Sequence, residues 1–186
     1  ERAVRTSGSR FVYLMGDIVL VQFALVRHAL DVLMARGFTP VIPPVLVREE
    51  AMCGSGFLPT DEVNIYVTSP DELYLVGTSE VSLAAFHAGE ILDEADLPIR
   101  YAGYSTCFRR EAGTYGKDTR GLYRVHQFQK VEQVIVDIAD KVRKTIRRVQ
   151  GERQISILYT SHNMRDIEEV CDRVIFLHKG RVVAEG

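Results

Sequence analysis

The sequence predicts an α+β fold in which an antiparallel sheet is flanked by helices. Two long runs of alternating apolar and polar residues, 99–110 and 125–136, are typical of neighbouring strands. Apolar residues at helical spacing over residues 17–36 predict a long helix. The composition, 46% hydrophobic and 26% charged, is ordinary for a soluble globular protein.

In chain order, the first predicted element is the helix over residues 17–36, which Asp17 can cap and Gly37 can end. An extended segment over residues 38–47 follows. It contains three prolines, which remove ladder donors, so we expect it at a sheet edge or an interface. The region continues with a short helix, two short strands and a second helix, over residues 49–53, 64–68, 73–78 and 80–88.

The pattern changes near residue 137, and no Gly/Ser linker marks the change. A basic helix from Ile138 to an expected end at Gly151 is followed by a short strand, an acidic helix and a hairpin, over residues 155–160, 163–171 and 174–184. A tail of this length is too small to bury a core of its own. We therefore expect two parts: an incomplete core over residues 1–137 and a small α/β appendage over residues 138–186.

Charge and cysteine content narrow the functional classes. The net charge is −2, divided as −5 up to Asp137 and +3 from Ile138 onward. The basic excess of the second part suits either a solvated helix face or a nucleic-acid surface. Three isolated cysteines argue against a disulfide framework or a structural zinc site, which makes the cytoplasm the expected location.

The ends and the apolar runs of the sequence carry two further expectations. No apolar run is long enough to span a bilayer, so no membrane segment is expected. The first residue is Glu1 rather than Met, so we expect that a piece has been removed upstream.

Polar residues of complementary chemistry alternate along the two long strands. Period-2 geometry places Arg109 and Glu111 on one face of the first strand. On one face of the second strand it places Arg124, Phe128, Lys130 and Glu132. Arginines hold phosphates, an aromatic ring stacks on a base and carboxylates accept from amino groups. A nucleotide site is one reading, and a solvated face with cross-strand ion pairs is the other.

A resemblance to a known family is carried by several stretches in order. They are Arg36-Gly37-Phe38, Gly77-Thr78-Ser79-Glu80, Phe108-Arg109-Arg110-Glu111 and Arg124-Val125-His126-Gln127-Phe128-Gln129-Lys130-Val131-Glu132. The last two resemble motif 2 of class II aminoacyl-tRNA synthetases and, more narrowly, of seryl-tRNA synthetases. The resemblance covers residues 1 to about 136.

For the nucleotide, the resemblance implies ATP with Mg²⁺ bridging its phosphates. It implies that Arg109 contacts the α-phosphate and that Arg124 reaches the terminal phosphates. Glu111 would accept from the adenine amino group, and Phe128 would stack beneath the ring.

For the amino acid, the resemblance implies that Arg109 holds the carboxylate of serine and that Glu132 binds its ammonium, with Thr78 and Glu80 assisting. The implied reaction is seryl-adenylate formation followed by transfer to tRNA. The resemblance also implies a homodimer formed through residues 17–44.

Two parts of the family pattern have no counterpart in these residues: the motif 3 arginine and the tRNA-binding arm. Losing a phosphate-binding arginine typically lowers the rate on the order of 100- to 1000-fold. We therefore expect this chain to be truncated and inactive alone.

The second part resembles another family. Tyr159-Thr160-Ser161-His162-Asn163-Met164 and Gly180-Arg181-Val182-Val183-Ala184-Glu185-Gly186 are similar to the switch region of ABC-transporter ATPase subunits, which implies that His162 is the switch histidine. Taken alone, a histidine at a strand end is more often structural. The phosphate-binding loop of such ATPases is not found in the sequence, so hydrolysis by this part is not expected.

Our interpretation is a chimera: a partial seryl-adenylate site joined, artificially or by rearrangement, to an ABC-like fragment. The alternatives are a non-catalytic module that binds ATP or seryl-adenylate, an inert fused scaffold and, more distantly, an ABC-type ATPase fragment.

Overall fold

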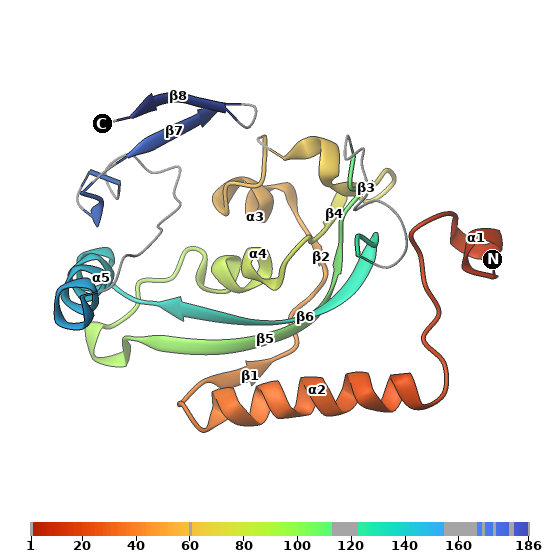
Figure 1. The fold of residues 1–186 in the computed structure, drawn as a ribbon, viewed down its shortest axis with the longest axis horizontal. Helices are drawn as coiled ribbons and strands as arrows, with labels where there is room; N and C mark the ends of the chain where they lie inside the picture. The colour runs from red at the N-terminus through yellow and green to blue at the C-terminus, as the bar shows by residue number, and fades with distance from the viewer. Residues whose placement is uncertain are drawn as a thin grey trace. The chain divides into compact units, whose positions relative to one another are not determined.

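The computed structural model describes residues 2–59, 61–112, 123–154, 167–168, 170–172, 174–178 and 181–185. The chain divides into two compact units, Glu1–Val136 and Asp137–Gly186, which are treated separately below. Helices and small antiparallel sheets occur together in the first unit, so the predicted α+β class is confirmed (Figure 1). None of the described helices is long and apolar enough to cross a bilayer.

The main sheet of the first unit has the order β1-β5-β6. Strands β5 (Ile99–Phe108) and β6 (Gln127–Val136) are antiparallel, and their register runs from Ile99 opposite Val136 to Phe108 opposite Gln127. Strand β1 (Thr39–Val41) runs parallel to β5 on its other side. The proline-containing segment therefore lies at a sheet edge, as the missing ladder donors predict.

Helix α2 (Asp17–Met34) covers one face of this sheet, where Leu33 packs with Phe38 and Ala102 (Figure 1). The expectation that Asp17 caps the helix was wrong. Gly16 is the N-cap residue, and its positive φ of 63° turns the chain into the helix without a side-chain cap. Gly37 follows the helix, which ends at Met34, two residues before the predicted end.

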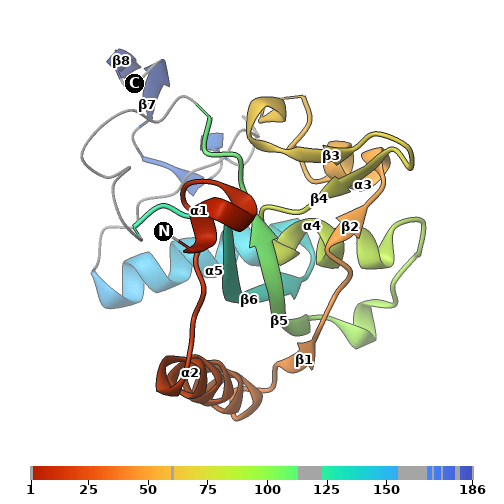
Figure 2. The same cartoon turned by 90° about the vertical axis from the view of Figure 1, so that its right-hand side faces the viewer.

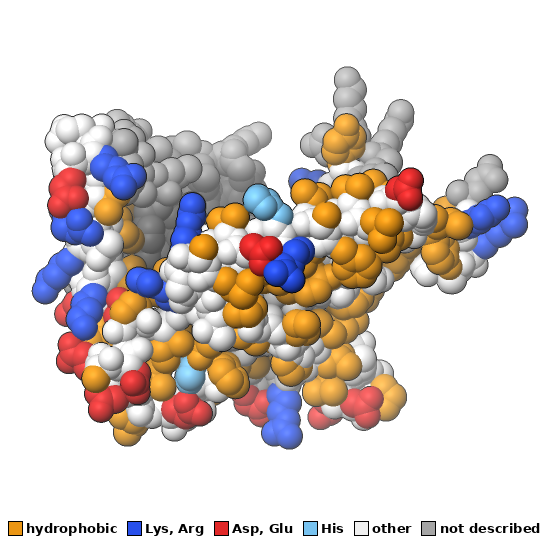
Figure 3. Space-filling model, turned by 90° about the horizontal axis from the view of Figure 1, so that it is seen from below, with side chains coloured by type: hydrophobic (Ala, Val, Ile, Leu, Met, Phe, Trp, Pro, Cys, Tyr) orange, Lys and Arg blue, Asp and Glu red, His pale blue; other side chains and the backbone are white. Residues whose placement is uncertain are grey.

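Much of the apolar surface of α2 stays exposed. Leu20 and Leu25 are 66% and 65% exposed, and Phe23 is 58% exposed. Seen from below, the space-filling view shows hydrophobic side chains gathered on the side of the first unit where α2 lies (Figure 3). Only Leu33 of this helix is buried.

Helix α4 (Ser79–Ala84) and the 3-10 turn η2 (Ala85–His87) lie on the opposite face of β5 and β6 from α2 (Figure 2). Gly103 of β5 permits the close approach of α4. A Cβ at that position would stand 2.7 Å from Leu83 Cδ1 and 2.8 Å from Ser79 Oγ. The side-chain oxygen of Thr78 caps α4 by accepting a hydrogen bond from the Glu80 backbone N–H.

A second sheet of order β2-β4-β3 completes the first unit. Its strands are β2 (Leu46–Val47), β3 (Tyr66–Thr68) and β4 (Leu73–Leu75). Its core is formed by Val47, Met52, Ile65, Val76 and Val81. The remaining short elements are α1 (Arg2–Ser7), α3 (Glu49–Gly54), η1 (Glu62–Asn64) and η3 (Glu94–Asp96).

The second unit contains helix α5 (Ala139–Arg153) and a hairpin of β7 (Ile175–His178) and β8 (Arg181–Glu185). The hairpin was predicted. The helix end was not: α5 continues through Gly151 to Arg153, and Gln154 takes the left-handed conformation instead. His162, the predicted strand over residues 155–160 and most of the acidic helix lie outside the described residues.

Candidate functional site

The site residues predicted on the two long strands lie where β5 ends, where β6 begins, and along one face of β6. Phe128, Lys130 and Glu132 alternate along β6 as predicted, opposite Cys107, Ser105 and Gly103 of β5. The strand positions of the other three residues were wrong. Arg109 and Glu111 follow the end of β5 at Phe108, and Arg124 precedes β6.

A cavity of about 330 Å³ opens at this end of the strand pair. Arg109, Glu111 and Arg124 line it together with Phe57, Asn64 and Gly77 among others. Arg124 Nη1 lies 3.2 Å from Glu111 Oε2, so the two residues that were assigned to opposite ends of a nucleotide form an ion pair in this structure. Glu111 has a positive φ of 51°, the left-handed region where most side chains are disfavoured.

Arg109 is the residue that joins the cavity to the β6 face. Its Nε donates to the Gly77 carbonyl over 3.3 Å. Its guanidinium carbon lies 5.4 Å from the centroid of the Phe128 ring, a distance at which a cation is attracted to an aromatic face. The Phe128 ring, which the family resemblance places beneath adenine, is therefore in contact with an arginine of the chain itself.

Farther along β6, the Glu132 carboxylate is the centre of a polar network. One of its oxygens, Oε2, accepts hydrogen bonds from Thr78 Oγ1 and, over 3.0 Å, from Ser79 Oγ. The other, Oε1, lies 2.6 Å from Lys130 Nζ, which also donates to Thr78 Oγ1 over 2.8 Å. Thr78 and Ser79 are buried, so α4 fixes the carboxylate against the sheet.

This network keeps the Glu132 carboxyl ionised. Burial would raise its pKa. Hydrogen bonds from Lys130, Thr78 and Ser79, together with the positive charge of Lys130, outweigh burial and hold the pKa of Glu132 below its ordinary value. The network therefore presents a fixed negative charge, which suits a cationic ligand group.

Glu80 does not take part in this network through its carboxylate. Its side chain is exposed, and the hydrogen bond it makes to Thr78 comes from its backbone N–H. Ser79 holds the place beside Glu132 instead. The sequence analysis missed Ser79 and predicted the helix only from residue 80, whereas α4 begins at Ser79.

Three residues that the sequence analysis did not select support the chain after β5. Asn64 accepts from the Arg110 N–H through its carbonyl and from the Ala112 N–H through its side chain, both over 2.9 Å. The Arg109 N–H donates to the His126 carbonyl and the Arg109 carbonyl accepts from His126 Nδ1, also over 2.9 Å.

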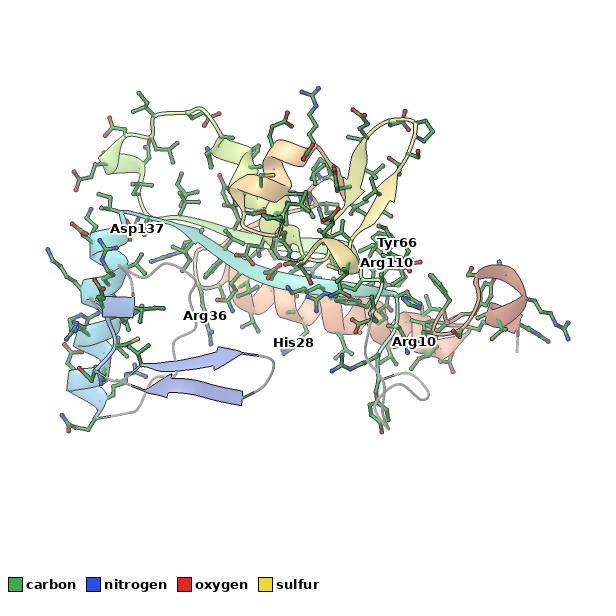
Figure 4. The ribbon with its side chains drawn as sticks, turned by 90° about the horizontal axis from the view of Figure 1, so that it is seen from above. Arg10, His28, Arg36, Tyr66, Arg110 and Asp137 are labelled. Carbon is green, nitrogen blue, oxygen red and sulfur yellow. The ribbon has the colours of Figure 1, made fainter. Side chains whose placement is uncertain are left out.

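The third support comes from the N-terminal segment. The His126 N–H donates to the Arg10 carbonyl over 3.1 Å, and Arg10 Nη1 donates to the Glu111 carbonyl over 3.4 Å. Arg10, Tyr66 and Arg110 gather at this end of the strand pair (Figure 4). Because these contacts join segments far apart in the chain, no local pattern reveals them.

The chain was compared with known proteins. A model of the tRNA synthetase class II core domain (G, H, P, S and T) matches residues 66–178, which extends past the border between the two units. A serine–tRNA ligase of Acidothermus cellulolyticus is 64% identical over 132 residues, which cover 71% of this chain and 31% of that protein. A serine–tRNA ligase of Thermobifida fusca is 47% identical over 180 residues, 97% of this chain and 41% of that protein.

Two solved structures are similar in fold. The crystal structure of a seryl-tRNA synthetase from Pyrococcus horikoshii complexed with ATP gives a TM-score of 0.72 at 49% identity, over 82% of this chain and 35% of that one. A cytoplasmic serine–tRNA ligase from Naegleria fowleri in complex with AMP gives a TM-score of 0.72 at 39% identity, over 83% of this chain and 37% of that one. The chain thus spans about a third of the length of most of these relatives.

Proposed function

The chain belongs to the tRNA synthetase class II core-domain family, and on that premise we propose that its first unit carries the serine-activating site of a serine–tRNA ligase. In the proposed reaction, a carboxylate oxygen of serine attacks the α-phosphorus of ATP, and the bond to the pyrophosphate oxygen breaks. The products are seryl-adenylate and pyrophosphate, and the seryl group then passes to a tRNA. Such a reaction depends on positioning and charge neutralisation rather than on a protein nucleophile.

One observation carries the proposal: Arg109 connects the arginine-lined cavity to the β6 face of the acidic network, because it lines the cavity and its guanidinium lies over the Phe128 ring. Glu132 presents a half-buried, ionised carboxylate, which suits an ammonium group. Arg109 and Arg124 line the cavity, which suits phosphates. Phe128 of the proposed nucleotide side and Glu132 of the proposed amino-acid side alternate on one face of β6, which supports a ligand that contains both parts.

On the nucleotide side, Arg109 binds the α-phosphate and Arg124 the terminal phosphates. Phe128 stacks beneath adenine and Glu111 accepts from its amino group. The described residues contain no cluster of three or more metal-ligating side chains. Mg²⁺ would be held mainly by the phosphates and water, which is its usual manner of binding in nucleotide sites.

On the serine side, Glu132 and Thr78 receive the ammonium group and Arg109 the carboxylate. Ser79 assists by fixing the carboxylate of Glu132. Glu80 assists at the serine side as the family resemblance implies. In this structure its side chain is exposed and its carboxylate lies outside the network.

We also propose that residues 17–44 form a homodimer interface in the cytoplasm. The exposed apolar residues of α2 support this proposal, because a helix with most of its apolar side chains in water gains free energy when a partner covers it. The edge position of β1 lies in the same segment and supports it as well.

For the second unit, the comparisons point in different directions. The family match as far as residue 178 and the 180-residue match to the Thermobifida protein favour a class II origin for part of this unit. The match to the Acidothermus protein is 132 residues long, close to the length of the first unit, which favours a join near residue 136. We propose the join, with residues 138–186 derived from an ABC-type ATPase and His162 as a relic of its switch. A chromosomal sequence that runs without interruption through codons 134–140 in several isolates excludes an artificial join.

For the 186-residue chain itself, we propose ligand binding with little turnover. Retention of Arg109, Glu111, Phe128 and Glu132 in one site supports binding. An inert scaffold is the competing proposal, and it requires that no nucleotide bind.

The test is a thermal melt with and without the non-hydrolysable analogue seryl-sulfamoyl adenosine, together with pyrophosphate exchange. At a hundredfold excess over its Kd, the analogue stabilises the folded chain by about 2.7 kcal/mol. A cooperative melt that does not move with the analogue overturns the proposal. Stabilisation without exchange identifies a binding module, and stabilisation with exchange identifies an enzyme.

A further inference from the structure

We propose that Lys130 occupies, in the ligand-free protein, the place that the ammonium group of serine takes on binding, and that it thereby sets how strongly the site selects for that group. This inference rests on the proposed function of the same site. It assigns a part to a residue that the family resemblance left without one.

The contacts of Lys130 are those expected of a bound ammonium ligand. Its Nζ lies 2.6 Å from Glu132 Oε1 and 2.8 Å from Thr78 Oγ1. A lysine side chain and the α-amino group of serine both end in a protonated amine with three donors, so they compete for the same acceptors. Thr78 is buried and caps α4, so the acceptors stay in place whichever amine is bound.

Lys130 is also able to leave. Its side chain is 30% exposed and has four flexible carbons, whereas the Glu132 side chain is 16% exposed. In the ligand-free state, Lys130 offsets the cost of burying the Glu132 charge, since a buried charge without a partner is strongly destabilising. Serine binding then exchanges one ammonium for another instead of creating a new ion pair.

Two other residues that are expected to contact the ligand also lie against a cation of the chain. Arg109 lies over the Phe128 ring, and Arg124 pairs with Glu111. Phe128, Glu111 and Glu132 are therefore each in contact with a cation of the chain. Lys130 stands between Phe128 and Glu132 along β6, between the two ends of the proposed ligand.

The experiment compares two ligands by isothermal titration calorimetry on the full chain. One is seryl-sulfamoyl adenosine, and the other is its 3-hydroxypropanoyl counterpart, which lacks the amino group. In the unchanged chain, Lys130 remains on Glu132 when the second ligand binds, so the Kd values differ little. In Lys130→Met, nothing replaces the missing amine, and we expect the ratio of the two Kd values to rise at least tenfold.

Lys144→Met is the matched control, because it removes an exposed lysine of α5 in the other unit and should leave the ratio unchanged. If Lys130→Met binds both ligands with the ratio of the unchanged chain, the inference is overturned while the proposed function stands. If the unchanged chain binds neither ligand, the inference and the proposed function are both overturned.

A second measurement needs no variant. The ¹⁵N signal of the Lys130 ammonium, slowed in exchange by its two acceptors, should persist with the ligand that lacks the amino group and broaden or shift with seryl-sulfamoyl adenosine. An equal response to both ligands also overturns the inference.

Discussion

Ser79 Oγ donates to Glu132 Oε2 over 3.0 Å, so a hydrogen bond joins the first residue of α4 to the carboxylate of a β6 residue. This contact exists because α4 approaches the sheet over Gly103, where no Cβ keeps it away. The depth of the packing and the geometry of the proposed ammonium subsite are therefore set by the same glycine.

Gly103→Ala tests this dependence. The new Cβ would stand 2.7 Å from Leu83 and 2.8 Å from Ser79, so α4 has to shift. We expect the free energy of unfolding to fall by about 1–3 kcal/mol, the usual cost of overpacking. Denaturant melts measure it, with Gly54→Ala as the control, because a Cβ there meets nothing within 4 Å. Equal melts for the two variants contradict the argument.

Glu132→Gln should alter how stability depends on pH. The pKa of Glu132 is below its ordinary value near 4.5 in the folded chain, so the unfolded chain binds the proton more tightly. The stabilising contribution is therefore fully present above about pH 5 and is lost as the pH falls through the lowered pKa. Urea melts from pH 7 to pH 3 should show the unchanged chain losing its advantage over Glu132→Gln at the acid end.

The control for that series is Glu80→Gln, because the Glu80 carboxylate is exposed and outside the network. A gap between Glu132→Gln and the unchanged chain that is the same at pH 7 and pH 3 speaks against an ionised Glu132.

Arg109→Lys should weaken nucleotide binding more than its conserved charge suggests. Lysine keeps the charge but loses the planar group that stacks on Phe128 and grips a phosphate with two donors. We expect the Kd for a non-hydrolysable ATP analogue to rise about 10- to 100-fold, since hydrogen bonds to charged groups contribute about 1.5–3 kcal/mol. Arg110→Lys is the neighbouring control, because Arg110 bonds Asn64 through its backbone N–H and does not line the cavity. If the two variants raise the Kd equally, the assignment of Arg109 to phosphate binding is wrong.

Replacing both Leu20 and Leu25 with Glu should dissociate the proposed dimer. These residues are 66% and 65% exposed on α2 in the single chain, so the change costs the monomer little, but it places charge in an apolar interface. Sedimentation velocity over a range of concentrations should show a dimer for the unchanged chain and a monomer for the variant. Ile91→Glu, at a fully exposed apolar residue outside α2, should remain dimeric. An unchanged chain that sediments as a monomer throughout refutes the interface.

The sequence predicted the strand pair and the shared face of Phe128, Lys130 and Glu132, because alternation along a strand depends only on local geometry. It failed where the backbone leaves that pattern. Arg109 and Glu111 were extrapolated along β5, but the strand ends at Phe108 and Glu111 turns into the left-handed region. That turn depends on contacts with distant segments, which no periodicity reports.

Ser79 and Lys130 illustrate the same limit from the other side. Neither residue stands out in the sequence. Their hydrogen bonds, Ser79 to Glu132 and Lys130 to Thr78, form only because α4 packs against the sheet at Gly103. The prediction for α2 failed more locally: a glycine with positive φ began the helix where a side-chain cap was expected, because Asp17 already lies inside the first turn.

The contacts of Arg10 and Phe11 with His126, and of Arg10 with Glu111, make the segment before α2 a brace behind the cavity. Neither Arg10 nor Phe11 is among the residues that line that cavity. A protease that cuts between Phe11 and α2 would therefore leave every ligand-facing side chain in place while releasing the peptide that holds Glu111 at its unusual backbone angle. Clipping the chain or fusing a tag in this segment would therefore alter the proposed nucleotide site.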